Sequence, residues 1–233
     1  MEPLTKAELE ALRAWPTPAI SNAIETFNVR PRNQGFMLGI KCIFPDLEPM
    51  VGYACTATMT ADLSVTEEER ARVIHAHWDN IVKTSAPRVV VIHDFDQPQC
   101  IGSLWGEVNA NIHRALGCVG VVTDGGVRDL DEVHPLGFHF FAADVIPSHA
   151  YNHLVDAGKP VRVGGLTVNN GDLIHADKHG VVVIPREIAR EVPKACQKVE
   201  DRERKVINFC KSPDFDVEAL KTIFPGSRKG GKS

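Results

Sequence analysis

The chain has 233 residues, of which 43% are hydrophobic, and no Pro/Gly/Ser-rich linker interrupts it. This length supports one sizeable core, so we expect a single domain over residues 1–225 and a short basic tail, 226–233, whose composition predicts disorder. The net charge is −4 and residues of both signs are scattered along the chain, so the sequence shows no basic patch that would bind nucleic acid or an anionic membrane. We therefore expect a small molecule as the partner.

The six cysteines show no C-x-x-C spacing, and the first residues lack the basic and apolar regions of a secretory signal. No apolar run approaches the ~18 residues that a membrane span requires. We therefore expect reduced thiols and a cytoplasmic protein.

Caps and periodicity predict the elements of the first half of the chain. Thr5 and Glu8 form a capping box before an apolar-periodic run, and Thr17-Pro18 starts a second helix. The next expected elements, in order, are a strand at 52–61, a helix from Thr66 to about Thr84, a buried strand at 88–93, a helix at 107–116 and a buried strand at 119–123. Because strands and helices alternate here, the sequence predicts a mainly parallel sheet.

The second half of the chain has a different pattern, in which short apolar runs are separated by Gly-rich turns with little helix between them. The predicted strands lie at 138–143, 161–163, 166–168, 172–175 and 181–184. They favour a barrel-like portion or a second sheet. A charged helix from about Pro185 to Cys210 is expected to close the domain.

Two strand-to-helix junctions collect glycines and charged side chains: G-S-L-W-G-E at 102–107 and D-G-G-V-R-D at 124–129. Glycine leaves room for a ligand beside the main chain. The helix that begins at Glu107 would expose the N–H groups of Val108 and Asn109, and a small carboxylate fits at such a helix start.

The strand at 119–123 would deliver Asp124, Arg128 and Asp129 into the same neighbourhood. An anion site, a fixed cation and a ligand for a hard metal are therefore predicted to converge. The residues also admit simpler interpretations, in which Asp129 caps a helix, Arg128 forms a surface salt bridge and Glu107 only stabilises the helix dipole. Asp124 is interpreted as a turn former or structural support rather than a ligand.

These two motifs, together with N-N-G-D-L-I-H-A-D-K-H-G-V-V-V-I-P at 169–185, resemble the RraA-like family. The likeness is greatest to its class II pyruvate aldolases, which act on 4-hydroxy-4-methyl-2-oxoglutarate and 4-carboxy-4-hydroxy-2-oxoadipate. The resemblance implies an α/β fold of the swivelling β/β/α type, with a mainly parallel central sheet and a barrel-like second sheet. One departure lies near the N-terminus, where relatives carry an aspartate and this chain has Asn22.

The resemblance also implies roles for the motif residues. Asp129 would be the direct protein ligand to Mg²⁺ or Mn²⁺, with water in most other positions. Arg128 would bind a carboxylate or enolate oxygen with paired N–H donors, and Glu107 would hold water for acid–base chemistry. The substrate would further be bound at Gly106, Val108 and Asn109.

Relatives borrow a further glutamate from the C-terminal helix of a neighbouring subunit. Glu203 is the best match in this chain, and Glu200 is the alternative. The resemblance therefore implies a homotrimer, or a dimer of trimers, with active sites at the subunit interfaces.

The implied reaction is divalent-metal-dependent cleavage of a 4-hydroxy-2-oxo acid to pyruvate and a second carbonyl product. Oxaloacetate decarboxylation should accompany it, since both reactions pass through a pyruvate enolate. The alternative is a non-enzymatic regulator, because the family also contains proteins that bind and inhibit a ribonuclease complex. The presence of Glu107, Arg128 and Asp129 together favours the enzyme.

The histidines are interpreted as structural. His75 and His77 lie two residues apart on a predicted helix and so face different sides, which argues against a shared zinc ion. The segment that holds His175, Asp177 and His179 is interpreted as hairpin turn chemistry.

Three further residues near the motifs have alternative interpretations. Trp105 is either a core aromatic or a pocket wall, and the sequence leaves both open. Cys100 and Cys118 are interpreted as packed thiols rather than nucleophiles. The glycines at 102–106 do not match the spacing of a Walker or dinucleotide fingerprint.

Overall fold

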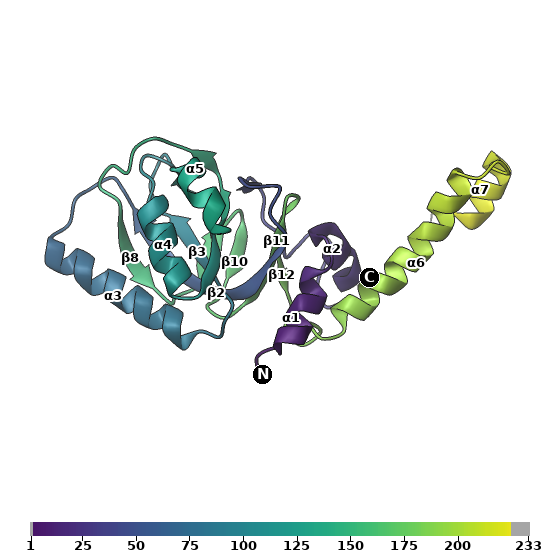
Figure 1. Ribbon diagram of the computed structural model, residues 1–233, viewed down its shortest axis with the longest axis horizontal. Helices are drawn as coiled ribbons and strands as arrows, with labels where there is room; N and C mark the ends of the chain where they lie inside the picture. Colours follow the sequence, from purple (N-terminus) through teal and green to yellow (C-terminus); the bar gives the residue numbers. More distant parts are fainter. Residues whose placement is uncertain (1, 225–233) are drawn as a thin grey trace.

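A computed structural model describes residues 2–224 and shows a mixed α/β fold built on one large sheet (Figure 1). The helices are α1 (Lys6–Arg13), α2 (Thr17–Glu25), α3 (Glu67–Lys83), α4 (Glu107–Ala115), α5 (Leu130–Val133), α6 (Val192–Cys210) and α7 (Val217–Ile223), with a 3₁₀ turn at His134–Leu136. The strands are β1 (Lys41–Cys42), β2 (Met50–Thr60), β3 (Arg88–Asp94), β4 (Cys118–Thr123), β5 (Gly126–Val127), β6 (His139–Ala142), β7 (Asp144–Val145), β8 (His153–Ala157), β9 (Val161–Val163), β10 (Leu166–Val168), β11 (Leu173–Asp177) and β12 (Gly180–Ile184). The tail predicted at 226–233 lies outside the described residues.

The large sheet has eight strands in the order β1-β6-β4-β3-β2-β11-β12, with β8 also paired to β2. Strands β2, β3, β4 and β6 run parallel, which confirms the prediction from alternating strands and helices. Strands β1, β8, β11 and β12 pair antiparallel with their neighbours, and the whole sheet is nearly closed and barrel-like. The predicted fold class is therefore confirmed.

Strand β2 is the longest strand and lies at the centre of this arrangement. One of its edges pairs with β3 from Tyr53 to Met59. Its other edge is divided, because β11 pairs with its first part and β8 with its last part. Strand β8 was not predicted, since the sequence H-L-V-D-A mixes polar and apolar residues without the alternation typical of a strand.

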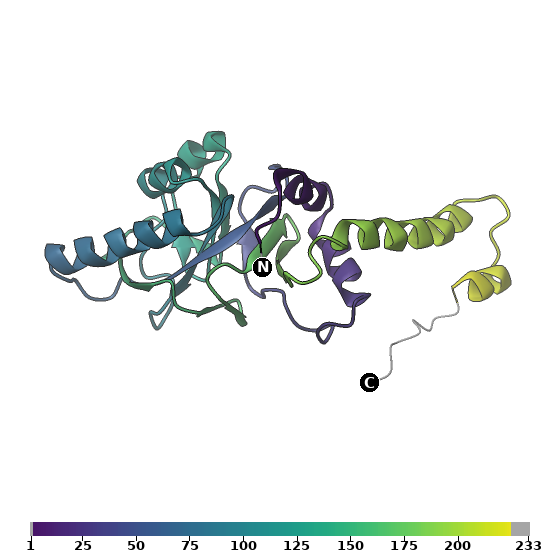
Figure 2. The same ribbon diagram turned by 90° about the horizontal axis from the view of Figure 1, so that it is seen from below.

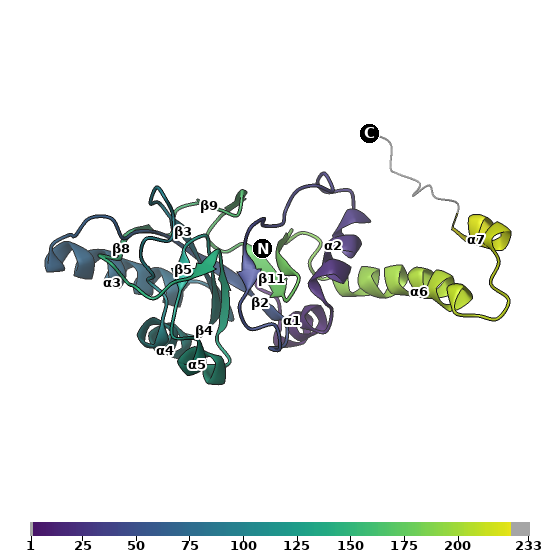
Figure 3. The ribbon, with the colours of Figure 1, turned by 90° about the horizontal axis from the view of Figure 1, so that it is seen from above.

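Helices cover the sheet in two places (Figures 1 and 3). Helices α3, α4 and α5 pack on one face of the parallel strands and bury a core there. Helices α1, α2 and the start of α6 pack on β11, β12 and the first part of β2. The hairpin of β9 and β10 covers the other face of the parallel strands.

The helix starts agree with their predicted caps. The side chain of Thr5 accepts a hydrogen bond from the backbone N–H of Glu8, and the Glu8 carboxylate accepts one in return from the N–H of Thr5. Thr66 likewise accepts from the N–H of Glu69 at the start of α3. Among the helices of residues 2–224, none combines the length and the apolar character that crossing a membrane requires.

Helix α6 differs from the prediction in its start and in its position. Residues 185–191 form turns, in which the N–H of Ile188 donates to the carbonyl of Pro185 (3.2 Å), and the helix begins at Val192. Pro193 lies in its first turn, where the missing N–H breaks no helical hydrogen bond. The helix packs on α2 near its start, and after Val199 it projects from the body with α7 at its end (Figure 2). The helix thus extends the molecule instead of closing the domain.

Candidate active site

The two Gly-rich motifs lie side by side, as predicted. Trp105 and Val127 form a parallel β-bridge, and the N–H of Arg128 donates to the carbonyl of Trp105 (3.0 Å). The hydroxyl oxygen of Ser103, which is 1% exposed, lies 2.8 Å from the carbonyl oxygen of Trp105 and 2.9 Å from that of Gly126. These contacts fix the junction before α4 against the segment after β4.

The carboxylate of Asp129 faces the first turn of α4. Asp129 has a left-handed backbone conformation (φ 55°), and its side chain makes no capping bond to α5. Instead, its Oδ2 accepts a hydrogen bond from the N–H of Glu107 (2.9 Å) and lies 3.8 Å from Nε of Arg128. The interpretation of Asp129 as a cap for the helix that follows it is therefore wrong, and its carboxylate joins the two motifs.

Gly106 makes this close approach possible. A Cβ atom at position 106 would lie 2.2 Å from Oδ2 of Asp129 and 3.2 Å from Cγ of Arg128. The first distance is far shorter than van der Waals contact. Besides its predicted place in substrate binding, Gly106 thus leaves the space that the Asp129 carboxylate occupies.

The start of α4 also provides backbone donors. Val108 and Asn109 lie in its first turn, where N–H groups have no intrahelical acceptor. The side chain of Val108 is 71% exposed, and that of Glu107 is also exposed. Since Asp129 already accepts from the N–H of Glu107, the donors at 108 and 109 are the ones that a bound anion could use.

Asp124 does not join Arg128 and Asp129, although the strand at 119–123 was predicted to deliver all three to one neighbourhood. Its Oδ1 accepts from the N–H of Asp94 (2.7 Å), and its Oδ2 lies 2.8 Å from Nδ1 of His93. Asp94 in turn accepts from the N–H groups of Asp96 (3.1 Å) and Cys100 (2.8 Å), and burial raises the pKa of its carboxyl. The structural interpretation of Asp124 is confirmed, because its carboxylate fixes the end of β3 instead of joining the contacts around Asp129.

A buried layer of aromatic and imidazole rings packs against the inner face of α4. Trp105 is fully buried, with its ring centroid 4.7 Å from that of His113 and 5.9 Å from that of Phe138, so it is a core aromatic. Nε2 of His113 lies 3.2 Å from Nε2 of His77 on α3. Burial lowers the pKa of His113 to about 4 and that of His77 to about 3, so both rings are neutral near pH 7. His75 is exposed, and the two histidines of α3 face different sides as predicted.

The two C-terminal glutamates lie far from this group in the same chain. Glu203 is exposed on the projecting part of α6, and Oε1 of Glu200 pairs with Arg204 (3.0 Å). Figures 1 and 3 show α6 on the opposite side of the molecule from α4 and α5. Asn22, on α2, also lies on the α6 side. None of these residues joins Asp129 within one chain.

The β11–β12 hairpin holds the start of α2, and the thiols of Cys100 and Cys118 have raised pKa values. Oδ2 of Asp177 accepts from the N–H of Thr17 at the start of α2 (2.9 Å), and Nδ1 of His175 lies 3.0 Å from the Thr17 hydroxyl. Burial raises the pKa of the Cys100 thiol to about 11 and that of Cys118 to about 12. A raised pKa disfavours the thiolate that a nucleophilic cysteine needs.

Comparison with known proteins assigns the chain to a family. Residues 17–183 match the model of the RraA-like family, described as Aldolase/RraA, and this range contains both motifs of the site. The chain belongs to the RraA-like family. A protein of Halalkalibacterium halodurans named "Putative 4-hydroxy-4-methyl-2-oxoglutarate aldolase" is 26% identical over 210 residues, which cover 86% of this chain and 89% of that protein.

Two further comparisons show how far the likeness extends. Protein DlpA of Legionella pneumophila is 26% identical over 175 residues, which cover 74% of this chain and 26% of DlpA. The chain therefore spans about a quarter of the length of that relative. The solved structure of Streptomyces coelicolor RraAS2, described as an unusual member of the RNase ES inhibitor RraA protein family, has a TM-score of 0.68 at 20% identity and covers 88% of this chain and 97% of its own. This likeness shows a shared fold.

Proposed function

We propose that this RraA-like protein is a divalent-metal-dependent aldolase that cleaves a 4-hydroxy-2-oxo acid to pyruvate and a second carbonyl compound. Decarboxylation of oxaloacetate is the expected accompanying activity. The observation that carries the proposal is the convergence of Asp129, Arg128 and the first turn of α4, for which Gly106 leaves the space. The names of the aldolase relatives support the same chemistry.

The residues present fit a hydrated hard cation. Asp129 is one-third exposed, and the hydrogen bond from Glu107 engages its Oδ2, which leaves Oδ1 for an ion. Within residues 2–224 no three His, Cys, Asp or Glu side chains converge on one point, so water would fill most of the coordination sphere. Mg²⁺ commonly binds through one or two carboxylates and keeps several waters. A divalent ion held by Asp129 would polarise the 2-keto oxygen as a Lewis acid.

The chain's own groups would then bind and protonate the substrate. Arg128 presents its planar guanidinium to the substrate carboxylate or the developing enolate oxygen, and the N–H groups of Val108 and Asn109 bind the remaining negative charge. Glu107, acting through a water molecule, accepts the proton of the C4 hydroxyl. The C3–C4 bond breaks, its electron pair forms the enolate, and the proton returned to C3 gives the methyl group of pyruvate.

We also propose that the active enzyme is a homotrimer, or a dimer of trimers, in which Glu203 of one chain reaches the site of the next. The projection of α6 away from the body supports this proposal, because Glu203 is exposed on α6, and α6 lies on the opposite side of the molecule from α4 and from α5, which Asp129 precedes (Figure 1). Glu200 is the weaker candidate, since it already pairs with Arg204.

A ribonuclease regulator is the alternative function in this family. It is supported by the fold that the chain shares with RraAS2. The sequence identity of 20% is too low to transfer an activity from one protein to the other. A protein-binding surface does not require a carboxylate, a guanidinium and a helix start arranged around a glycine gap. The site geometry therefore favours the enzyme.

Release of pyruvate tests the proposal. With oxaloacetate or 4-hydroxy-4-methyl-2-oxoglutarate as substrate, we expect turnover in Mg²⁺ or Mn²⁺, loss in excess chelator and recovery when the ion is restored. Asp129→Asn removes the carboxylate charge at nearly constant volume and should lower turnover by orders of magnitude with an unchanged circular dichroism spectrum. Asp131→Asn, at an exposed neighbouring position on α5, is the matched control. Full turnover in excess chelator, or by Asp129→Asn, would contradict the proposal.

A further inference from the structure

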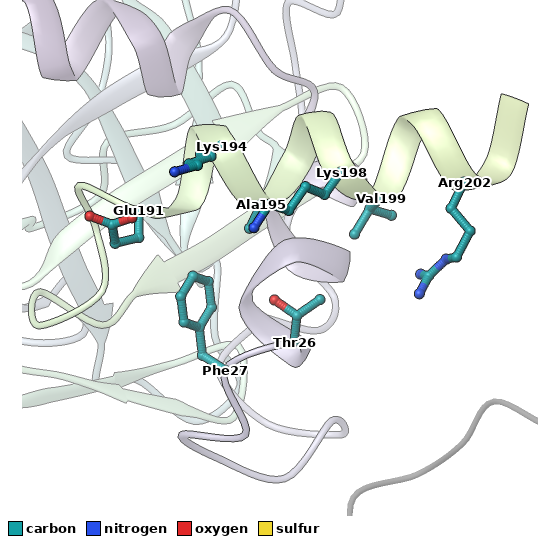
Figure 4. Close-up of a pocket in the computed structure, with 8 residues that line it drawn as sticks. All are labelled: Thr26, Phe27, Glu191, Lys194, Ala195, Lys198, Val199 and Arg202. Carbon is teal, nitrogen blue, oxygen red and sulfur yellow. The ribbon is translucent and has the colours of Figure 1, made fainter.

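A hollow of about 390 Å³ lies between α2 and α6. Figure 4 shows the residues that line it, which come from α6, from its N-cap Glu191 and from the two residues that follow α2. Ala195 and Val199 are buried, and together with the ring of Phe27 they give it an apolar floor. Three cations of α6 also line it, namely Lys194, Lys198 and Arg202.

The three cations are arranged along the hollow. They recur at intervals of four residues, so they share one face of α6 and extend over about 12 Å of its length. In Figure 4 the side chains of Lys194 and Lys198 run back along the helix toward its N-terminal end, and the guanidinium of Arg202 is turned to the side of Thr26. Positive charge is thus spread along the hollow instead of gathered at one point.

These cations lack acidic partners. None of the three forms an ion pair with another residue of the described range, although Arg204 on the same helix pairs with Glu200. Glu191 is the one carboxylate in the lining, which therefore carries a net of two positive charges in a chain whose own net charge is −4. The three cations are exposed, and they border a hollow whose floor is apolar.

We propose that this hollow binds a small, elongated polyanion with two or more phosphate or carboxylate groups. Lys198 and Arg202 would form charge-assisted hydrogen bonds with the anionic groups, and Phe27 would cover the rest of the molecule. The ligand would contact Thr26 and Phe27, directly after α2, and the cations of α6, so it would hold the base of the projecting helix against the body. The site is distinct from the one around Asp129.

Bound polyanion would also affect the proposed active site of a neighbouring chain. Glu203 directly follows Arg202 on α6, so a ligand that holds this part of α6 against the body also restrains the backbone that carries the glutamate proposed to act across the interface. This consequence rests on the proposed function. The binding itself does not, because it is measured without substrate.

Isothermal titration of the full-length protein with inorganic pyrophosphate and, separately, with citrate tests the site. We expect saturable binding of at least one of the two anions, with one site per chain and an affinity that falls as salt is added. The double variant Lys198→Ala/Arg202→Ala should bind that anion about tenfold more weakly or worse, as expected for lost charged hydrogen bonds. The anion that binds identifies phosphate or carboxylate as the recognised group.

The control is the double variant Lys205→Ala/Lys211→Ala. It removes the same charge from α6 and its C-cap, outside the hollow, and should keep the wild-type affinity. All four positions are exposed, so both variants should fold with an unchanged circular dichroism spectrum. Failure of both anions to bind saturably, or an equal loss of affinity in the two double variants, would overturn the proposal.

Discussion

The pair formed by Gly106 and Asp129 shows how one absent side chain shapes the site. Asp129 adopts a left-handed backbone conformation, which costs a non-glycine residue on the order of 1–3 kcal/mol and persists only where the surrounding structure holds it. Here the hydrogen bond from Glu107 and the backbone bond of Arg128 to Trp105 supply that restraint. The carboxylate is thereby held over the start of α4 before any ligand arrives.

Substitution of Gly106 tests this arrangement. In Gly106→Ala the new Cβ would overlap Oδ2 of Asp129, so the carboxylate must leave the N–H of Glu107. We expect turnover to fall by orders of magnitude and Mn²⁺ binding, measured by electron paramagnetic resonance, to weaken, with an unchanged circular dichroism spectrum.

Gly171→Ala is the matched control. A Cβ there meets open space, but the residue has a φ of 86°, so the variant should lower Tm and leave turnover per folded molecule unchanged. Near-normal turnover of Gly106→Ala would show that the present position of Asp129 is not required.

The sequence predicted which segments meet at the site better than it predicted their contacts. Arg128 and Asp129 do meet the start of α4, because a Gly-rich turn after a buried strand and a neighbouring helix start share one edge of the sheet. That Asp129 would accept from an N–H 22 residues away could not be predicted, since it depends on the distance between two segments. Ser103 was also missed, although a small hydroxyl residue inside a Gly-rich motif is a signal for backbone bridging.

Among the elements, those with strong local signals were predicted and those that depend on tertiary pairing were not. The capping residues Thr5 and Thr66 placed the starts of α1 and α3, and runs of Val and Ile placed β3 and β4. Strand β8 forms because the edge of β2 needs a partner, and its own sequence carries little strand preference. The start of α6 was placed too early because turns at 185–191 contain residues that a helix also tolerates.

The contact between α3 and α4 makes stability depend on pH. His77 and His113 have pKa values of about 3 and 4 because they are buried, against an ordinary value of 6.5. Between pH 6.5 and about 4 the unfolded chain therefore binds more protons than the folded one, and the free energy of unfolding falls as the pH is lowered. Each histidine contributes at most about 1.4 kcal/mol per pH unit in this window and nothing above it. His139 and His175, also lowered to about 4 by burial, act in the same direction.

Urea denaturation at pH 7.5, 6 and 5 measures this dependence. The His77→Gln/His113→Gln variant should lose less stability between pH 7.5 and pH 5 than the wild type, whatever its absolute stability. His75→Gln, on an exposed face of α3, should show the same change in the free energy of unfolding with pH as the wild type. If the double variant lost as much stability between pH 7.5 and pH 5 as the wild type, the pH dependence would come from other groups.

At the scale of the whole molecule, the most distinctive feature is the projecting α6 with α7 at its end (Figures 1 and 2). The exposed apolar residues of this region include Ile207, Phe215, Val217, Ile223 and Phe224. The sequence did not predict the projection, because a charged amphipathic helix can lie on its own domain or on another chain. Exposed apolar side chains on a projecting helix support the proposed assembly with neighbouring copies.

Subunit exchange tests whether Glu203 acts across an interface. Asp129→Ala and Glu203→Ala should each be inactive, and a mixture of the two should regain activity, because some sites would then pair an intact Asp129 with an intact Glu203. Such recovery requires a closed head-to-tail ring in which each site draws on two chains. Exchange can be followed by mass spectrometry of the mixed oligomers. Proven exchange without recovery would place the whole site within one chain.

Strand β2 has a consequence for the way the molecule unfolds. Its residues enter all three buried clusters: Cys55, Ala57 and Met59 face the helices α3 to α5, Val51 and Tyr53 face α1, α2 and α6, and Met50 and Ala54 face the β9–β10 hairpin. No cluster can therefore melt through loss of β2 without exposing the other two. The single strand couples the part of the protein that holds Asp129 to the part that anchors α6, so we expect the two parts to unfold as one cooperative unit.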